Sequence, residues 1–488
     1  MKKLVSIIIS AVLTLAFMIS PEALKVDKIN FNNPDFIRGM DISSVISLEN
    51  SGVKFYDAKG NEADIFKTLS ENGVNYIRVR VWNNPFDKDG NGYGGGNNDV
   101  NTACKIGKRA ADNNMKLLVD FHYSDFWADP SKQKAPKSWE GLTVENKEII
   151  IAEYTENSLN EIKNAGADIG MVQIGNETNG GLAGEYSEEN KAKLFKAAGE
   201  AVREFNSEVK IAVHFTNPEN TETMKYFADY LNNYEVDYDV FAVSYYPYWH
   251  GSLSNLTEVL SYPAEKYGKY AMVAETSYAN TLTDTDGHPN TVSEYSNNSG
   301  DNLLWDFTPQ GQADEVRAVM NAVNNVKNNK GLGVFYWEGA WISVGDTSTL
   351  SGTQYTERLN ANKKLWESFG SGWACSYSGE YDAEDAGKYY GGSAVDNQAF
   401  FNAQGKPLPS LKVFKYVYSD VLRGDSNDDG EVDILDATAI QKHAAKLKDI
   451  NETAADVNGD GAVTITDATI IQKYIAKIEV EYNINQLV

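Results

Sequence analysis

Residues 168–178 read Asp-Ile-Gly-Met-Val-Gln-Ile-Gly-Asn-Glu-Thr, and this stretch decides the fold of the chain. Four of its first seven residues are apolar, and so short an apolar run is typical of a buried β-strand. The run ends in Gly175-Asn176-Glu177, which sets a carboxylate beside an amide. Barrels of parallel strands carry catalytic groups at the carboxyl ends of their strands. We therefore predict a catalytic Glu177, although the stretch taken alone also fits a glutamate that merely faces water.

Similar short apolar runs alternate with longer segments of helical period between about Asn30 and Ser419. The predicted strands are 38–42, 76–82, 116–122, 168–175, 210–215, 240–246, 271–275 and 333–338. Eight strands alternating with helices indicate an α/β fold, a (β/α)8 TIM barrel with long βα loops. An open doubly wound sheet would need a glycine-rich phosphate-binding turn after its first strand, and the sequence has none there.

A second carboxylate, Glu275, ends the seventh predicted strand. Strands four and seven lie nearly opposite on a barrel wall, so Glu177 and Glu275 can both reach one bond. Glycoside hydrolysis needs such a pair, because one carboxyl protonates the leaving oxygen while the other attacks the sugar carbon or activates water. A separation of about 5–5.5 Å gives retention and about 6.5–9.5 Å gives inversion, a distance that the sequence leaves open.

Other polar and aromatic residues gather at the same strand ends. Arg78 and Arg80 share one face of the second predicted strand, and an arginine from this face that lies beside Glu275 would keep the pKa of that carboxyl low. Asn176 could hold the sugar 2-hydroxyl. Glu338 is a rival acid, for which a structural or binding role is the favoured interpretation. The predicted substrate-binding residues are Asp41, His122, Trp127, His214, Tyr246, Trp337 and Trp341.

Two predicted loops are unusually long. Residues 83–101 are rich in glycine and asparagine, which predicts a mobile surface loop. Residues 338–408 follow the eighth strand and carry Trp341, Trp366 and Trp373. Long loops at the catalytic face are more often functional than idle, so we expect this one to wall a substrate groove.

A candidate calcium site follows the seventh strand. Asp284, Asp286 and Asn290 offer side-chain oxygens that suit a hard cation. His288 would contribute its backbone carbonyl, because imidazole suits softer metals. A plain Asp-Gly turn is the alternative interpretation of this segment.

The C-terminal region contains a twofold repeat of a twelve-residue calcium loop, at 425–436 and 456–467. Oxygen ligands sit at positions 1, 3 and 5, a glycine at position 6 makes the turn, and an acid sits at position 12. The predicted ligand positions are Asp425, Asn427, Asp429, Glu431 and Asp436 in the first copy, and Asp456, Asn458, Asp460, Ala462 and Asp467 in the second. Each loop runs into one helix, and the entering helix of an EF-hand is absent.

This repeat resembles a type I dockerin, a small all-α calcium-binding module. The resemblance implies two bound calcium ions, calcium-dependent folding and binding to a cohesin domain of a scaffolding protein. Positions 10 and 11 of each loop would help to choose the partner; they are Ile434, Leu435, Ile465 and Thr466. The predicted domains are a catalytic domain at 30–419, a short linker at 420–424 and the dockerin at 425–480.

The barrel resembles glycoside hydrolase family 53, the arabinogalactan endo-β-1,4-galactanases. Four motifs carry the resemblance: Phe-His-Tyr-Ser-Asp-Phe-Trp-Ala-Asp-Pro at 121–130, Ile-Gly-Asn-Glu at 174–177, Ser-Tyr-Tyr-Pro at 244–247 and Phe-Tyr-Trp-Glu-Gly-Ala-Trp at 335–341. It implies a retaining mechanism on the galactan side chains of pectin, with Glu177 as acid/base, Glu275 as nucleophile and Arg78 as the family's strand-two arginine. It also implies a structural calcium ion at 284–290. The 83–101 loop departs from the family and could alter subsites.

The chain has 44 Lys+Arg against 69 Asp+Glu, a formal net charge of -25. Such a chain repels nucleic acid, anionic membranes and polyanions such as pectate, and it suits neutral substrates and calcium. No sequence feature calls for an organic cofactor, and we expect a monomer. The rival functions are another retaining β-endoglycanase, such as a mannanase or cellulase, and a non-catalytic carbohydrate-binding or assembly protein.

The N-terminus predicts a signal peptide at 1–23. Lys2 and Lys3 precede an apolar core, Leu4–Ile19, that is shorter than the ~20 residues of a membrane span. The cleavage site lacks a clean small-x-small pattern, so retention as an anchor stays the alternative. We expect a secreted, extracellular, cellulosome-associated protein with no membrane contact once the signal is removed.

Overall fold

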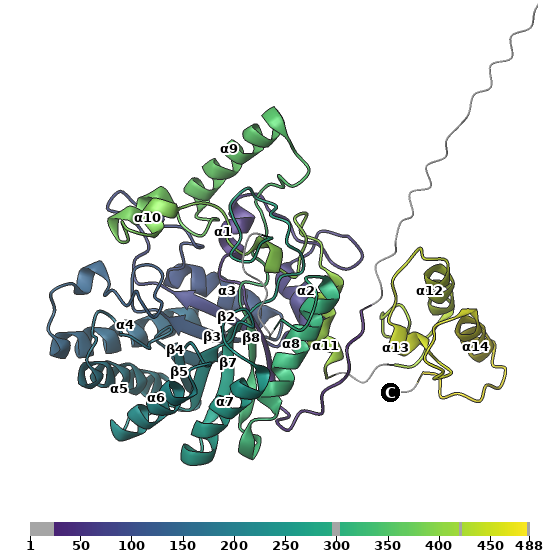
Figure 1. The fold of residues 1–488 in the computed structure, drawn as a ribbon, viewed down its shortest axis with the longest axis horizontal. Coiled ribbons are helices and arrows are strands. Elements are labelled where there is room, and N and C mark those ends of the chain that lie inside the picture. Colours follow the sequence, from purple (N-terminus) through teal and green to yellow (C-terminus); the bar gives the residue numbers. More distant parts are fainter. Residues whose placement is uncertain (1–23, 295–302, 419–421, 486–488) are drawn as a thin grey trace, which may run out of the picture. The chain divides into compact units, whose positions relative to one another are not determined.

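The computed structural model describes residues 24–294, 303–418 and 422–485 (Figure 1). Residues 26–419 form one compact unit, and the residues from Asp420 onward belong to a second. The predicted signal peptide lies outside the described residues. Across the described ranges, no helix combines the length and the apolar character that crossing a membrane requires.

The first unit contains a closed barrel of eight parallel strands that follow one another in sequence order. They are β1 (Ile37–Asp41), β2 (Tyr76–Val81), β3 (Lys116–Phe121), β4 (Ile169–Ile174), β5 (Lys210–Phe215), β6 (Val240–Ser244), β7 (Tyr270–Thr276) and β8 (Gly331–Tyr336). Pairing of β1 with β8 closes the barrel. The predicted TIM barrel is confirmed, and each predicted strand overlaps an observed one.

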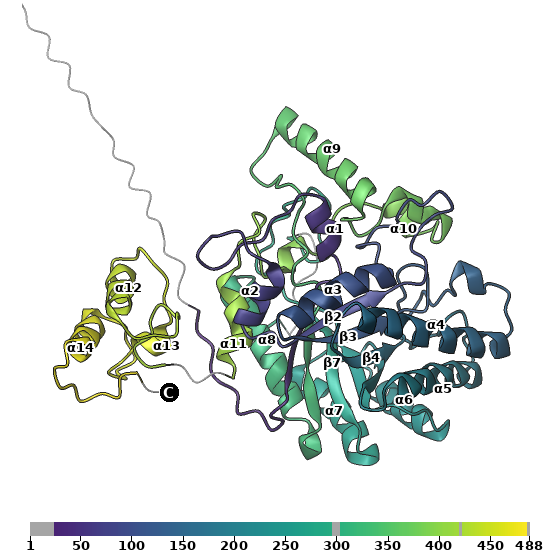
Figure 2. The same cartoon turned by 180° about the vertical axis from the view of Figure 1, so that it is seen from behind.

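Helices cover the outside of the barrel (Figures 1 and 2). Between consecutive strands lie α1 (Val45–Asn50), α2 (Ile65–Glu71), α3 (Val100–Asp112), α4 (Val144–Asn164), α5 (Glu188–Phe205), α6 (Thr221–Asn233), α7 (Leu253–Tyr267) and α8 (Pro309–Asn324). The first turns of α2, α3, α4, α5, α7 and α8 are capped by side-chain oxygens. Ser187, for example, accepts the backbone N–H of Asn190 at the start of α5.

The chain after β8 forms a long excursion at the carboxyl ends of the strands. It contains α9 (Gly352–Phe369), α10 (Ala386–Tyr389) and several single turns, and it ends in α11 (Val413–Tyr416). A 3-10 turn, Pro409–Lys412, leads directly into this short helix.

The barrel interior changes from apolar to polar along the strands. Side chains alternate, so Leu118 and Asp120 on β3, and Met171 and Gln173 on β4, face the same side of their strands. Leu118 and Met171 belong to an apolar cluster. Two residues further along, Gln173 Nε2 donates to Asp120 Oδ1 at 2.6 Å. The carboxyl ends of the strands therefore carry a buried polar network above an apolar floor.

Residues 83–101 differ from the predicted surface loop. The exposed residues of this segment are Asn84, residues 88–90 and Asn101, whereas residues 93–96 are buried and Tyr93 completely so. Gly95 donates its backbone N–H to Gly372 at 2.7 Å, so the glycine-rich part packs against the chain that follows β8. Glycine allows this close approach, which composition alone does not distinguish from an exposed loop.

The second unit contains α12 (Ile434–Ala444), α13 (Glu452–Ala455) and α14 (Ile465–Ile475). Alanine and isoleucine side chains from α12 and α14 form its apolar core. Both long helices begin with a capping box, in which the acid at loop position 12, Asp436 or Asp467, bonds the backbone of the residue before the helix. The repeat in the sequence is therefore also a repeat in the structure.

Candidate active site

The end of β4 turns sharply and aims Glu177 into a cavity. Gly175 has a φ of 114°, and a Cβ at this position would lie 2.6 Å from the methyl group of Thr178. Glu177 itself has a φ of 46°, a region that residues with a side chain rarely occupy. Such backbone costs of order 1–3 kcal/mol and clusters at functional sites.

Arg78 on β2 balances the carboxylates at the base of this cavity. Its Nη1 lies 3.0 Å from Asp41 Oδ2, and its Nη2 lies 2.8 Å from Asp120 Oδ2 and 2.9 Å from Glu275 Oε1. One guanidinium therefore faces three carboxylates that water barely reaches. Burial raises the pKa of Glu275 above its usual value, and Arg78 opposes that rise. The prediction of a low pKa for Glu275 is therefore wrong, because removal from water outweighs the nearby cation.

Both oxygens of Glu275 are held in place. Oε1 accepts from Arg78, and Oε2 accepts from the hydroxyl of Tyr246 at 2.9 Å. Glu275 lies on β7 and lines the cavity together with Tyr246. Two donors on opposite oxygens fix the orientation of the carboxylate, as a nucleophile requires.

Glu177 is held differently, without a cation. The hydroxyl of Ser244 on β6 donates to Glu177 Oε1 at 2.6 Å. Ser244 Oγ in turn lies 2.9 Å from Nε2 of His214, whose pKa is held well below its usual value by burial and by the positive charge of Arg78. The sequence offers no signal for this role of Ser244, since a serine at a strand end is common.

The two carboxyls therefore have different proton affinities. Burial, followed by the negative charge of Glu275, raises the pKa of Glu177 to about 8. Glu275 has the positive charge of Arg78 on one oxygen, so it gives up its proton more readily than Glu177. The cavity therefore holds one carboxyl that keeps its proton up to about pH 8, Glu177, and one that releases its proton more readily, Glu275.

The cavity has a volume of about 340 Å³ and brings together most of the predicted site. Arg78, Asn176, Glu177 and Glu275 line it, as do His122, Trp127, Tyr246, Trp337 and Trp341. Further lining residues that the sequence analysis did not assign are Asp129, Lys132, Trp249, Trp373, Asp385 and Gln398. The last three belong to the chain after β8, which therefore walls the cavity as predicted.

Two predicted substrate-binding residues lie behind the cavity wall instead of on it. Asp41 and His214 are completely buried and do not line the cavity. Asp41 Oδ2 accepts from Arg78, and Asp41 Oδ1 accepts from Ser43. The strand-end positions of Asp41 and His214 were predicted correctly. Their side chains, however, form hydrogen bonds with neighbouring residues and hold Arg78 and Ser244 in place.

The rival acid Glu338 is also kept from the cavity. Its Oε1 lies 2.5 Å from Arg80 Nη1, and its Oε2 accepts from Ser44 Oγ at 2.7 Å. The guanidinium of Arg80 lies 4.4 Å from the ring centre of Trp127. Glu338 therefore anchors the arginine on which a cavity-lining tryptophan rests, which agrees with the favoured structural interpretation.

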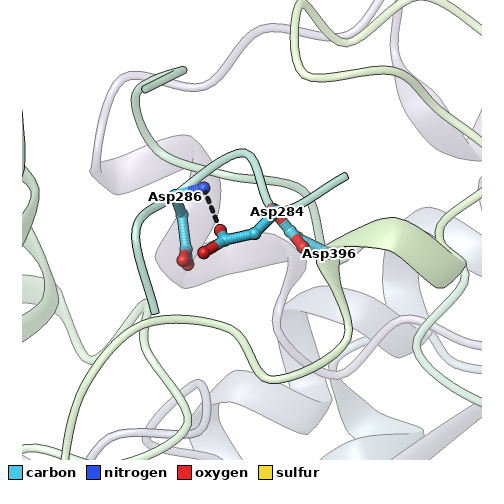
Figure 3. A group of neighbouring side chains, drawn as sticks. All are labelled: Asp284, Asp286 and Asp396. Atoms are coloured by element: carbon cyan, nitrogen blue, oxygen red, sulfur yellow. Dashed lines mark hydrogen bonds between the residues drawn. The ribbon is translucent and has the colours of Figure 1, made fainter. Parts of the chain in front are cut away.

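Two aspartates of the segment after β7, Asp284 and Asp286, form a group with Asp396 of the chain after β8 (Figure 3). One oxygen from each lies within 4.8 Å of the others, and they form the one such group of carboxylates, histidines or cysteines found in the described ranges. Burial raises the pKa of Asp396 to about 6 and that of Asp286 well above its usual value. Asp396 is a member that the sequence analysis missed.

The donor set of this group suits calcium. Asn290 Nδ2 donates to Asp396 Oδ1 at 2.5 Å, whereas Asn290 Oδ1 is buried without a hydrogen-bond partner. His288 donates its backbone N–H to Asp286 Oδ1 at 2.7 Å, and its ring packs against Trp366 instead of joining the carboxylates. Several carboxylate oxygens and a free amide oxygen are the ligands that a hard cation prefers.

The two loops of the second unit have matching hydrogen bonds. Asp425 accepts the backbone N–H groups of Asp429 and Gly430, and Asp456 accepts those of Asp460 and Gly461. The side chains at loop positions 10 and 11 are exposed; they are Ile434, Leu435, Ile465 and Thr466. Apolar side chains this exposed are available to a partner protein.

Comparison with known proteins agrees with this geometry. A solved structure of an Ignisphaera aggregans GH53 catalytic domain is 36% identical and covers 81% of this chain and 99% of its own, with a TM-score of 0.70. An endo-beta-1,4-galactanase of Bacillus subtilis is 56% identical over 398 residues, 82% of this chain and 90% of that protein. An arabinogalactan endo-beta-1,4-galactanase of Humicola insolens is 32% identical over 67% of this chain and 97% of that protein.

Two family models match separate parts of the chain. Residues 37–414 match glycosyl hydrolase family 53, and residues 423–476 match the type I dockerin domain. These ranges correspond to the barrel and to the helical unit with the repeated loops. The chain is therefore a glycoside hydrolase that belongs to family 53 and carries a type I dockerin domain at its C-terminal end.

Proposed function

We propose that the barrel is an endo-β-1,4-galactanase that hydrolyses the galactan side chains of pectin with retention of configuration. The observation that carries the proposal is the pair Glu177 and Glu275, which share one cavity with different hydrogen-bond partners and different proton affinities. The names of the relatives from Bacillus subtilis and Humicola insolens support the choice of substrate.

In the first step, the ionised Glu275 attacks the anomeric carbon of a galactose unit. The bond from that carbon to the glycosidic oxygen breaks, and Glu177 gives its proton to the departing oxygen. Arg78 and Tyr246 keep the attacking carboxylate in line, and Asn176 is positioned to bond a sugar hydroxyl. The product is a galactosyl ester of Glu275 and a shortened chain with a free hydroxyl.

In the second step, Glu177 is ionised and takes a proton from a water molecule. The water oxygen attacks the anomeric carbon, and the ester bond to Glu275 breaks, which restores both carboxyls. The raised pKa of Glu177 serves both steps, because a group with a pKa near the working pH both donates and accepts a proton readily.

The calcium sites form a second part of the proposal. Asp284, Asp286, Asn290 and Asp396, with the His288 carbonyl, would hold one ion that joins the segment after β7 to the segment around residue 396. The dockerin would hold two more at its predicted ligand positions, since type I dockerin domains bind calcium. When bound, these ions neutralise clustered carboxylates and order the loops that carry them.

We further propose that the protein is secreted by its signal peptide and attached to a cellulosome-like scaffold. The dockerin match and the exposed residues at loop positions 10 and 11 support binding to a cohesin domain. Calcium-dependent binding to a panel of cohesins tests this part, and replacement of Ile434 and Leu435 by aspartate should weaken it.

The decisive experiment for the barrel is reducing-sugar release from linear β-1,4-galactan, β-mannan and carboxymethylcellulose, by the wild type and by Glu275→Ala. Activity on galactan alone that disappears in the variant is the expected result. Activity on mannan or cellulose instead would overturn the substrate assignment but keep the barrel chemistry. A folded, calcium-loaded protein with no activity on any polymer would favour a carbohydrate-binding role.

A further inference from the structure

Gln173 on β4 joins the hydrogen bonds that support Glu275 to those that support Glu177. It is completely buried and does not line the cavity. Its Nε2 lies 2.6 Å from Asp120 Oδ1 and 3.0 Å from His214 Nδ1. Asp120 holds the arginine that pairs with Glu275, whereas His214 contacts the serine that bonds Glu177. One amide therefore lies between the two halves of the catalytic pair.

The orientation of the Gln173 amide follows from the charges of its neighbours. Its Oε1 faces Arg78 Nε at 3.4 Å, and an arginine can only donate. Its Nε2 faces Asp120. Burial opposes the ionisation of Asp120, but Arg78 and His122 outweigh it, so the pKa of Asp120 is below its usual value and the carboxylate only accepts. The amide therefore has one favourable orientation, with its oxygen at Arg78 and its nitrogen at Asp120.

One hydrogen of the Gln173 Nε2 group is bound to Asp120, which leaves the second hydrogen for another acceptor. Nδ1 of His214, at 3.0 Å, is closer than the side-chain oxygen of Asn176 and a backbone oxygen, both at 3.2 Å. The Asn176 oxygen already accepts from Arg78 at 3.1 Å. The second hydrogen is therefore directed at His214 Nδ1.

A donor at Nδ1 decides where His214 carries its proton. Burial and the charge of Arg78 hold the pKa of His214 well below its usual value, so the ring is neutral and has one N–H. Nδ1 accepts from Gln173, and from the Glu177 backbone N–H at 3.4 Å, so the proton is on Nε2. Nε2 then donates to Ser244 Oγ at 2.9 Å, which leaves the Ser244 hydroxyl to donate to Glu177 Oε1 at 2.6 Å.

We propose that Gln173 is a positioning residue, which holds His214 in this tautomer and so turns the Ser244 hydroxyl toward Glu177. The role rests on the proposed galactanase function, in which Glu177 is the acid/base. Without the Gln173 donor, His214 Nδ1 still faces Asn176 Oδ1 at 3.0 Å, an acceptor that favours a proton on Nδ1. Nε2 would then accept the Ser244 hydroxyl hydrogen, and Glu177 would lose that hydrogen bond.

The test compares Gln173→Met with the wild type, with Ser244→Ala and with the double variant. NMR of the imidazole nitrogens in isotope-labelled protein reports the tautomer, and a chain with 5 histidines allows each ring to be assigned by its own substitution. The pH dependence of kcat on linear β-1,4-galactan reports the proton of Glu177. Gln312→Met is the matched control, because Gln312 is also completely buried and donates to several oxygens, but does not line the cavity or contact His214.

These variants leave the charged and titratable groups around Glu177 in place. A shift of the pH profile therefore reports a hydrogen bond and not a change of charge. The groups are Glu275 on β7, Asp129 after β3, Tyr246 after β6, His214 on β5, Arg78 on β2 and, along the same cavity, Lys132 and Asp385.

We expect the wild type to carry the His214 proton on Nε2, and Gln173→Met to shift it to Nδ1. Because the ionised Glu177 then loses a donor, the high-pH limb of kcat should move upward by about one pH unit and kcat should fall by about tenfold. Adding Gln173→Met to Ser244→Ala should move the limb no further, since Gln173 acts through Ser244. Gln312→Met should lower Tm but leave the limb and the His214 signals unchanged.

A wild-type His214 proton on Nδ1 would overturn this inference alone, and that measurement decides the matter if Gln173→Met does not fold. Unchanged His214 signals in Gln173→Met, or a limb that Gln173→Met moves equally with and without Ser244, would overturn it as well. A wild-type protein without activity on galactan would overturn the proposed function and the role of Gln173 in it, whatever the tautomer.

Discussion

Two groups of buried carboxylates lie near the substrate cavity, and they differ in how their negative charge is balanced. Asp41, Asp120 and Glu275 surround the guanidinium of Arg78, at 2.8 to 3.0 Å. One oxygen from each of Asp284, Asp286 and Asp396 lies within 4.8 Å of the others, but within the described ranges no lysine or arginine forms an ion pair with them. The first group carries its cation in the chain, whereas the second would take its cation, the proposed calcium ion, from solution.

The arginine of the first group is always present, whereas a calcium ion in the second group would be present only when the solution supplies it. Unpaired buried charge is costly, and the first group balances its charge with Arg78, whereas the second would depend on the solution to supply its cation. The Asp396 segment also contributes Ala394, Val395 and Gln398 to the cavity wall. Calcium would therefore govern the shape of the wall, while Arg78 and its partners perform the chemistry.

The largest loss of activity is expected when Glu275, the proposed nucleophile in the first group, is replaced. Glu275→Gln should lower kcat on galactan by about 10,000-fold or more, because Glu275 is the carboxylate that Arg78 and Tyr246 hold for attack on the anomeric carbon. Glu338→Gln is the matched control, since Glu338 also ends a strand but bonds Arg80 and Ser44 outside the cavity. A control that loses as much activity as Glu275→Gln would contradict the assignment.

The next largest effect should come from removal of the built-in cation. Arg78→Met leaves Asp41, Asp120 and Glu275 without a cation, which makes the first group resemble the second. Breaking a buried pair in this way costs about 3–5 kcal/mol of folding stability. We expect a lower Tm together with a loss of activity of about 100-fold or more. Arg109→Met, which removes a partly exposed arginine from its pairs with Glu49 and Asp64, should change both far less.

Calcium removal should affect the second group and spare the first. All 9 tryptophans precede residue 420, so tryptophan fluorescence follows unfolding of the barrel alone. Calcium at about 100 times its Kd should stabilise the wild type by about 2.7 kcal/mol relative to the chelated protein. Asp396→Asn should lose most of this gain, while Asp467→Asn in the dockerin should keep it. If the Tm of the barrel is the same with and without calcium, the second group binds no such ion.

The smallest change should come from Ser244→Ala. The pKa of Glu177 is raised to about 8, so the wild-type rate should fall above about pH 8 as the proton donor ionises. The Ser244 hydroxyl donates to the ionised carboxylate and favours that form. Its removal should therefore raise the pKa of Glu177, move the high-pH limb upward and cost about tenfold in kcat. A limb that stays in place would contradict the role of Ser244.

The local features of this account were accessible from the sequence. Strands and their order follow from short apolar runs at regular spacing, and residues at strand ends converge because a parallel barrel brings them to one face. Arg78, Asn176, Glu177 and Glu275 could be predicted for this reason. The repeated calcium loops were equally clear, because ligand spacing within twelve residues is a local property.

Features that depend on distant contacts were not accessible. Asp396 lies 106 residues beyond its partner Asn290, in a long excursion without periodicity. Asp41 and His214 were placed at the right strand ends, but the direction of their side chains depends on neighbours from other strands. The burial of Tyr93 likewise results from contact with residues near 372, which the glycine-rich composition of its loop does not reveal.

The most direct test of the central claim is to trap the covalent intermediate. A 2-deoxy-2-fluoro-β-1,4-galactobioside with a dinitrophenolate leaving group should react once, because the fluorine slows both steps and the good leaving group restores the rate of the first step alone. Proteolysis and mass spectrometry then locate the sugar. The account predicts a galactobiosyl ester on Glu275. An ester on Glu177 or Glu338, or full activity on galactan with no trapped ester, would contradict it.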